Sequence, residues 1–336
     1  MVSTVSPAEG PADRLRALMR GGRFAEALAA FHMADEAARR RPDVALLAAT
    51  SATRLGELAE ARALAEGALA AFRARGDRDG RMRALNLLGV IGFEQGRVAD
   101  AEAALVEALS LARELEDSQL AARASNNLAS LEHLRGRGAE ALMLYRSALL
   151  SYQRLGDRRG TAETYHNLGL VFRHLGSWQQ AEDAEAEALR HAEVVGESSL
   201  LAIVVTGQAE LRVERGDLAL AEPELERAAR LAGEAGDELG IAEVGRLRAR
   251  AALRRGDGER ALREAESAYA LASRHGAAVL RADCGAALAL ALRMLNRVDE
   301  AEARRAEVLE AYEALGAAAL AERFGAEWSD GLDGQG

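Results

Sequence analysis

The chain has no lysine, a single cysteine and only four prolines in its 336 residues. Without lysine it cannot form a Schiff base or a lysine-dependent phosphate-binding loop. One cysteine, Cys284, excludes a disulfide framework within the chain and favours a reducing compartment. Few prolines leave long helices uninterrupted, because a proline inside a helix removes a backbone hydrogen bond.

Long hydrophobic runs and an excess of positive charge are also missing. The longest aliphatic run, residues 200–205, is far too short to span a bilayer. The first residues, MVSTVSPAEGP, lack the basic and apolar regions of a secretory signal. The formal net charge of −10 argues against nucleic acid as the main partner. We therefore expect a cytoplasmic protein with neither a membrane nor a nucleic-acid partner.

Sequence motifs of catalysis are absent as well. There is no G-x-S-x-G, no H-E-x-x-H and no glycine-rich phosphate loop with lysine. Cys284 has no histidine near it in the sequence, so we expect it to be a buried apolar thiol. The sequence predicts a non-enzymatic protein without a cofactor or a metal ion.

What the chain does have is an internal repeat. A glycine followed five residues later by alanine recurs along the sequence, and after the second copy the step is 40 residues. Asn296 replaces glycine in the last copy, and Asn tolerates the left-handed backbone of a tight turn better than other residues. The pairs are Gly22/Ala27, Gly56/Ala61, Gly96/Ala101, Gly136/Ala141, Gly176/Ala181, Gly216/Ala221, Gly256/Ala261 and Asn296/Ala301.

A second series of glycines runs between the first, on the same 40-residue grid, at positions 76, 156, 196, 236, 276 and 316, with Glu116 at the one missing place. Each repeat is therefore predicted to hold two helices of roughly 15–18 residues. Small residues recur seven positions before each turn, where Leu15 of the first copy is the exception. Small side chains allow neighbouring helices to approach closely.

This pattern resembles the tetratricopeptide repeat (TPR), in the 40-residue form of kinesin-light-chain-like proteins and of sensor domains in bacterial regulators. The resemblance covers essentially the whole chain. It implies an all-α, right-handed α-solenoid of about eight helix-turn-helix repeats. We predict a flexible N-terminus at 1–10, a solenoid over 11–316, a capping helix at 317–328 and a disordered tail at 329–336. The repeats are expected at about 11–41, 42–76, 77–116, 117–156, 157–196, 197–236, 237–276 and 277–316.

In this family the first helix of each repeat lines a concave face, and the inward positions lie ten, nine, six, three and two residues before the turn. Placed on this sequence, these positions imply a peptide-binding groove. The candidate groove residues are Asn86, Val90, Phe93, Asn126, Asn127, Ser130, His133, His166, Asn167, Leu170, Arg173, Arg246 and Arg250.

Four of the five asparagines fall on these inward positions, although Asn is a poor residue inside a helix. A primary amide donates and accepts hydrogen bonds, so it suits the peptide group of a bound segment. The alternative is that the asparagines bond neighbouring repeats and stabilise the stack.

The histidines and arginines allow similar alternatives. His166 and His174 lie about 12 Å apart along one helix, too far to share a metal ion, and we expect them to be polar lining with pH-sensitive charge. Arg246, Arg250 and Arg254 form a stripe near Arg293. The stripe is either a pocket for an acidic group of the partner or a face paired to acids such as Glu243, Glu210 and Glu214.

The sequence thus predicts a scaffold or adaptor that holds a protein or peptide segment in its groove. The alternative is a regulatory sensor that binds a peptide signal or small ligand and changes the shape of the superhelix.

Overall fold

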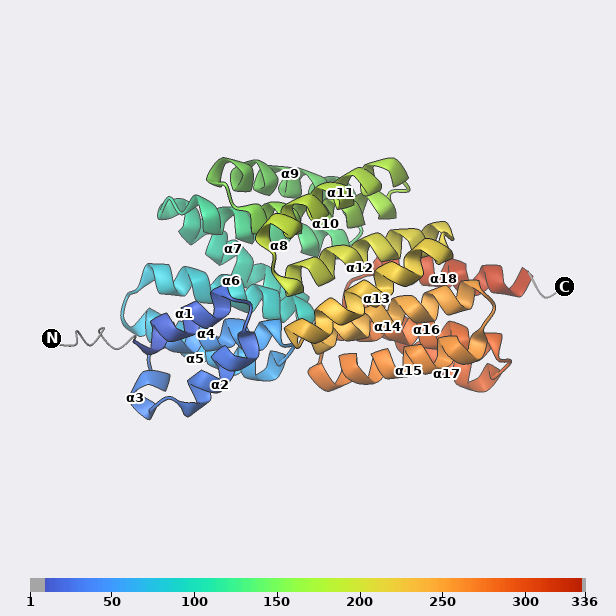
Figure 1. Cartoon of the computed structure of the whole chain (residues 1–336), viewed down its shortest axis with the longest axis horizontal. Helices are drawn as coiled ribbons and strands as arrows, with labels where there is room; N and C mark the ends of the chain where they lie inside the picture. Colours follow the sequence, from blue (N-terminus) through green and yellow to red (C-terminus); the bar gives the residue numbers. More distant parts are fainter. Residues whose placement is uncertain (1–9, 334–336) are drawn as a thin grey trace, which may run out of the picture.

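The computed structural model describes residues 10–333, which form 18 α-helices and no strand (Figure 1). Sixteen of them pair into eight helix-turn-helix repeats, and we call the first helix of each pair helix A and the second helix B. The A helices are α1 (Pro11–Arg20), α4 (Pro42–Arg54), α6 (Arg78–Glu94), α8 (Ser118–Leu134), α10 (Arg158–His174), α12 (Ser198–Arg215), α14 (Glu238–Arg254) and α16 (Ala278–Met294). The B helices are α2 (Phe24–Met33), α5 (Leu58–Ala74), α7 (Val98–Glu114), α9 (Gly138–Leu155), α11 (Trp178–Val195), α13 (Leu218–Ala235), α15 (Gly258–His275) and α17 (Val298–Ala314).

Two further helices lie outside the pairs. The short α3 (Glu36–Arg39) joins repeats one and two, and α18 (Ala318–Asp333) follows the last repeat. The predicted all-α solenoid of about eight repeats with a C-terminal helix is therefore confirmed. Helix α18 extends to Asp333, five residues beyond its expected end at 328. Residues 1–9 and 334–336, where a flexible N-terminus and part of the tail were expected, lie outside the described residues.

The turns between helices follow the repeated glycines. Asn296 has φ 59°, so it takes the left-handed conformation expected of it, and Glu116 does the same with φ 56°. Several A helices are preceded by an aspartate that follows such a turn directly. The carboxylate of this aspartate accepts a hydrogen bond from the backbone N–H of the third residue after it, as Asp77 does from Gly80 at 2.8 Å. Turn and cap together end one helix and start the next within a few residues.

Small residues set the distance between the helices of a pair. A methyl group added at Gly89 of α6 would lie 2.4 Å from Leu105 of α7, closer than side chains pack. Leu15, the large residue in the first repeat, is nevertheless only 1% exposed. The first repeat therefore packs into the apolar cluster of the N-terminal repeats with a larger side chain than the other repeats use at this position.

Helix A of each repeat contacts helix A of the next, so the A helices form an inner layer. In Figure 1, α9 and α11 lie at the upper edge and α15 and α17 at the lower edge, with the A helices between them. No helix within residues 10–333 has the length and hydropathy needed to cross a membrane.

The solenoid also closes on itself. A methyl group added at Gly96, in the turn of repeat three, would lie 2.8 Å from Ala278 and 2.5 Å from Leu315. Gly56 of repeat two meets Leu239 in the same way, and α6 contacts α16. The N-terminal repeats therefore lie against the C-terminal ones (Figure 1), and we call the concave side of the A helices the channel.

Candidate functional site

Asparagines of successive A helices contact one another along the concave face. Asn127 Nδ2 donates to Asn86 Oδ1 at 3.3 Å, and Asn167 Nδ2 donates to Asn126 Oδ1 at 3.4 Å. Thr164 also donates to Asn126 Oδ1, at 3.0 Å. The four asparagines thus link repeats three, four and five, as the alternative of a stack-stabilising role requires. We call them the asparagine ladder.

The ladder still leaves hydrogen-bonding groups unused. Within residues 10–333, Asn86 Nδ2, Asn127 Oδ1 and Asn167 Oδ1 have no hydrogen-bond partner, and none is a buried orphan atom. Asn126 is buried, and its side-chain oxygen already accepts two hydrogen bonds, whereas the other three asparagines are half-buried. Three rungs therefore present a donor or an acceptor to the channel while holding the repeats together.

Two histidines meet in the channel from neighbouring repeats. His133 Nε2 and His174 Nδ1 are 2.6 Å apart, and the ring centroids are 4.6 Å apart. Desolvation in the channel, reinforced by the Arg173 guanidinium, lowers the pKa of His133 to about 4 and that of His174 to about 3. The lowered pKa values favour the neutral form of both rings near pH 7.

His166 has a different environment. Its Nδ1 lies 3.1 Å from Glu185 Oε1 of α11, and this pair is almost fully buried. Burial opposes protonation, but the Glu185 carboxylate outweighs it and holds the pKa of His166 above its ordinary value. The ring is therefore bound to its own helix pair and is not a free groove contact. Among residues 10–333, no three His, Cys, Asp or Glu side chains group as a metal site requires.

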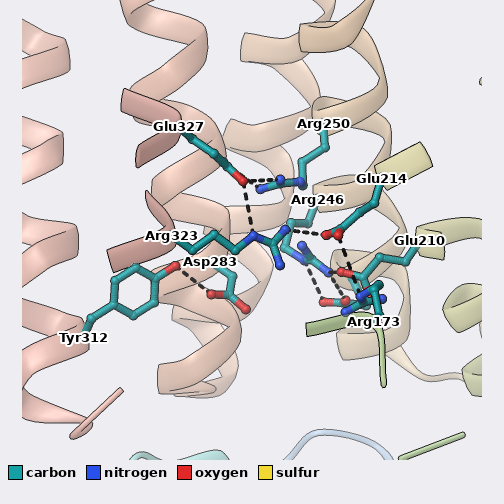
Figure 2. Close-up of polar contacts among 10 residues, drawn as sticks. Arg173, Glu210, Glu214, Arg246, Arg250, Asp283, Tyr312, Arg323 and Glu327 are labelled. Carbon is teal, nitrogen blue, oxygen red and sulfur yellow. Dashed lines mark hydrogen bonds and ion pairs between the residues drawn. The ribbon is translucent and has the colours of Figure 1, made fainter. Parts of the chain in front are cut away.

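A buried ion-pair network crosses three A helices (Figure 2). Glu210 of α12 accepts from Arg173 of α10 at 2.5 Å and from Arg246 of α14 at 2.6 Å. Arg246 also donates to Glu243 at 2.5 Å. Burial would raise the pKa of Glu210, but the two guanidinium groups hold it well below its ordinary value. Arg173 and Arg246 are thus occupied by protein carboxylates, and they are buried rather than solvated.

Helix α18 supplies the partner of the next arginine. Arg250 donates to Glu327 Oε1 at 2.7 Å, and Glu327 also accepts from Arg323 at 3.2 Å. Arg323 in turn pairs with Glu214 of α12 (Figure 2). The acid expected at Arg250 from a partner is therefore present within the chain itself.

The remaining candidate residues differ in how open they are. Val90 and Leu170 are half-buried on their A helices. Phe93 packs against the apolar cluster of the C-terminal repeats, so it takes part in closing the ring. Ser130 lies 2.8 Å from the hydroxyl of Tyr145 in α9. The half-buried residues of the concave face in repeats three to five include Val90, Leu170, Asn86, Asn127 and Asn167.

Comparison with known proteins decides the family. The tetratricopeptide repeat model matches residues 41–114 and 120–193, which fall in repeats two to five. A Rap protein complexed with Competence and Sporulation Factor has a similar structure, with a TM-score of 0.72 and 16% identity over 91% of this chain and 85% of that one. Repeats two to five are therefore tetratricopeptide repeats.

Other solved structures share the fold with this TPR protein. The Rap conjugation gene regulator of plasmid pLS20, in complex with the Phr* peptide, has a TM-score of 0.66 and 16% identity, over 82% of this chain and 76% of that one. Aspartyl phosphate phosphatase F from Bacillus subtilis has a TM-score of 0.60 and 11% identity, over 93% and 96% of the two chains. No curated protein sequence matches the chain. At these identities the likeness establishes the fold alone.

Several residues of the channel were not among the candidates from the sequence. Glu94, at an inward position of α6, has its pKa raised to about 7 by burial and by Asp237 and Glu243 of α14. Tyr312 donates to Asp283 at 2.7 Å beside the network. The sequence could have suggested Glu94, because it lies at an inward position two residues before Gly96. It could not have suggested its acidic neighbours, which belong to a repeat four steps along the chain.

Proposed function

We propose that this TPR protein is a non-enzymatic scaffold that binds an extended peptide segment of a protein partner on the concave face of repeats three to five. The observation that carries the proposal is the asparagine ladder, with unused amide groups at Asn86, Asn127 and Asn167. These amides suit the N–H and C=O groups of a peptide backbone, whatever the side chains of the peptide.

The spacing of the rungs fits an extended guest. Adjacent A helices pack about 10 Å apart, and an extended chain rises about 3.3 Å per residue. Each rung would therefore meet about every third residue of the peptide, with Val90 and Leu170 beside it as apolar contacts. The Rap regulator of pLS20 was solved with a peptide, which supports a peptide as the class of ligand on this fold.

The experiment is a selection from a displayed library of random nonapeptides against the full chain, followed by affinity measurement on the selected peptides. The double variant Asn127→Ala and Asn167→Ala is expected to lose at least tenfold in affinity. The matched control is Gln180→Ala, which removes an exposed amide from helix B of repeat five. Equal binding by the double variant and the control would refute the groove, and so would a selection that yields no peptide.

A second candidate is a regulator that responds to its ligand by changing shape, and the contact between repeats three and eight favours it. A ligand that widens the channel must separate the Gly96 turn from Ala278 and Leu315. Small-angle scattering tests this: the radius of gyration should rise when a selected peptide is added. An unchanged scattering curve at saturating peptide would leave the scaffold as the better description.

A further inference from the structure

Helix α18 begins two residues after Gly316, in the sequence register of a ninth helix A, but the described chain holds no helix B to cover it. Its contacts repeat those of an earlier helix A. Glu163, near the start of α10, lies 3.5 Å from Arg54, two residues before the turn at Gly56. Arg323 of α18 pairs in the same way with Glu214, two residues before the turn at Gly216. Each pair spans the channel between repeats three steps apart.

The attachment of α18 is nevertheless weaker than that of a complete repeat. Between residues 318 and 329 only Phe324 and Trp328 are buried. Helix α16, by contrast, buries nine residues, from Ala282 to Leu292. A helix of this length is marginal on its own in water and depends on its packing. The free energy that opposes opening of α18 is therefore expected to be among the lowest in the solenoid.

The groups beneath α18 lie on the inward positions of repeats six to eight. Glu214 contacts Arg323, Arg250 contacts Glu327, and Arg293 donates to the carbonyl of Trp328. Arg293 also lies over the Trp328 ring, 4.8 Å from its centroid. We call Glu214, Arg250 and Arg293 the α18 seat.

The seat is incompletely satisfied by its occupant. Among the residues that the structure describes, Arg250 Nε and Arg293 Nη2 are buried and have no hydrogen-bond partner. A buried N–H that lacks an acceptor destabilises the arrangement that buries it. Burial also opposes ionisation of Glu327, but Arg250 and Arg323 outweigh it and keep its pKa below the ordinary value, so the carboxylate is charged at neutral pH.

We propose that α18 is an exchangeable occupant of the concave face: it leaves its seat, and a partner helix with an acid followed directly by an aromatic residue takes its place. Glu327 and Trp328 define this pattern, with Phe324 one turn before. The inference rests on the proposed function in that the same concave surface receives the partner. It concerns repeats six to eight, whereas the asparagine ladder lies in repeats three to five.

The first test is hydrogen exchange on the unmodified full chain. Amides of residues 320–329 are expected to exchange at least tenfold faster than those in the middle of α16. Equal protection of the two helices would overturn the proposal, because α18 would then open only together with the solenoid. This measurement needs no variant and therefore does not depend on the folding of one.

The second test uses a fluorescein-labelled synthetic peptide of residues 317–333 as the probe. A full-length release variant, Phe324→Ala with Trp328→Ala, is expected to bind the probe at least tenfold more tightly than the unmodified chain. Adding Arg250→Ala should reverse this gain, whereas Arg281→Ala, an exposed arginine of α16 without an ion pair in the described residues, should not. Equal binding by the release variant and the unmodified chain, or equal effects of the two arginine changes, would overturn the exchange.

The two proposals fail separately. Asn127→Ala with Asn167→Ala should leave capture of the 317–333 probe unchanged, because the ladder is not part of the α18 seat. If the nonapeptide experiment fails while the probe experiment succeeds, the proposed function is wrong and the exchange of α18 stands. The reverse result rejects the exchange and leaves the proposed function.

Discussion

Glu210 is the residue at which the structure predicts the largest single effect on stability. Its carboxylate is shared by Arg173 and Arg246, and the three side chains are between 6% and 9% exposed. Replacing it as Glu210→Gln keeps the shape and one acceptor oxygen but removes the charge. Two buried guanidinium groups then lose their common counter-ion, and breaking a buried ion pair in this way costs about 3–5 kcal/mol.

Urea denaturation followed by circular dichroism measures the difference, with Glu187→Gln as control. Glu187 pairs with Arg190 on the exposed face of α11, and such surface pairs contribute under about 1 kcal/mol. The pH dependence gives a second check. Because the folded-state pKa of Glu210 is depressed, its stabilisation is present at neutral pH and is lost as the pH falls through that pKa. The free energies of unfolding of the unmodified protein and of Glu210→Gln should therefore become equal in strongly acidic solution.

The reasoning would be refuted if Glu210→Gln cost no more than Glu187→Gln at pH 7. It would also be refuted if the cost were the same at pH 7 and in acid. A cost no larger than that of Glu187→Gln would mean that water reaches the network and screens its charges as on the surface. A cost that does not change with pH would mean that it does not come from the charge of Glu210.

Four other substitutions test the local physics of the fold. Glu94→Gln should raise the free energy of unfolding by about 1–3 kcal/mol above pH 7 and leave it unchanged near pH 4. The reason is that Glu94, with its pKa raised to about 7, must ionise in a buried site as the pH rises, whereas Gln stays neutral. A stability difference in urea denaturation that does not change with pH would contradict this. Gly67→Ala, where nothing lies within 4 Å, should stabilise by about 1 kcal/mol through helix propensity, whereas Gly89→Ala should destabilise because its methyl group meets Leu105; thermal unfolding that moves both midpoints in the same direction would contradict the packing argument. Glu116→Gly should stabilise by about 1 kcal/mol, because the backbone at φ 56° disfavours a side chain; an unchanged or lower unfolding midpoint would argue otherwise.

The candidate site was predictable only in part. The inward register placed Asn86, Asn127 and Asn167 on one face, and their contact with one another follows from the stacking of identical repeats. The same register placed Arg246 in the groove, where it is instead buried between two carboxylates. Sequence alone left both alternatives open for this arginine, because the choice depends on which acid the neighbouring helix brings within reach.

The sequence by itself determined the helices, their turns and their order. Asn296 and the repeated glycines end helices because of their own backbone preferences. The small residues seven positions before a turn set the distance between the two helices of a pair. These are local effects, so the repeat period is enough to predict them. They fixed the solenoid without reference to any distant residue.

Only the tertiary structure decided that repeats two and three lie against repeats seven and eight. The contacts of Gly96 with Leu315, of Glu94 with the acids of α14 and of Arg323 with Glu214 join residues several repeats apart. They depend on the small rotation between successive repeats, which accumulates along the chain and has no signature in any single repeat. That accumulated rotation places α18 over the inward arginines and brings repeats two and three against repeats seven and eight.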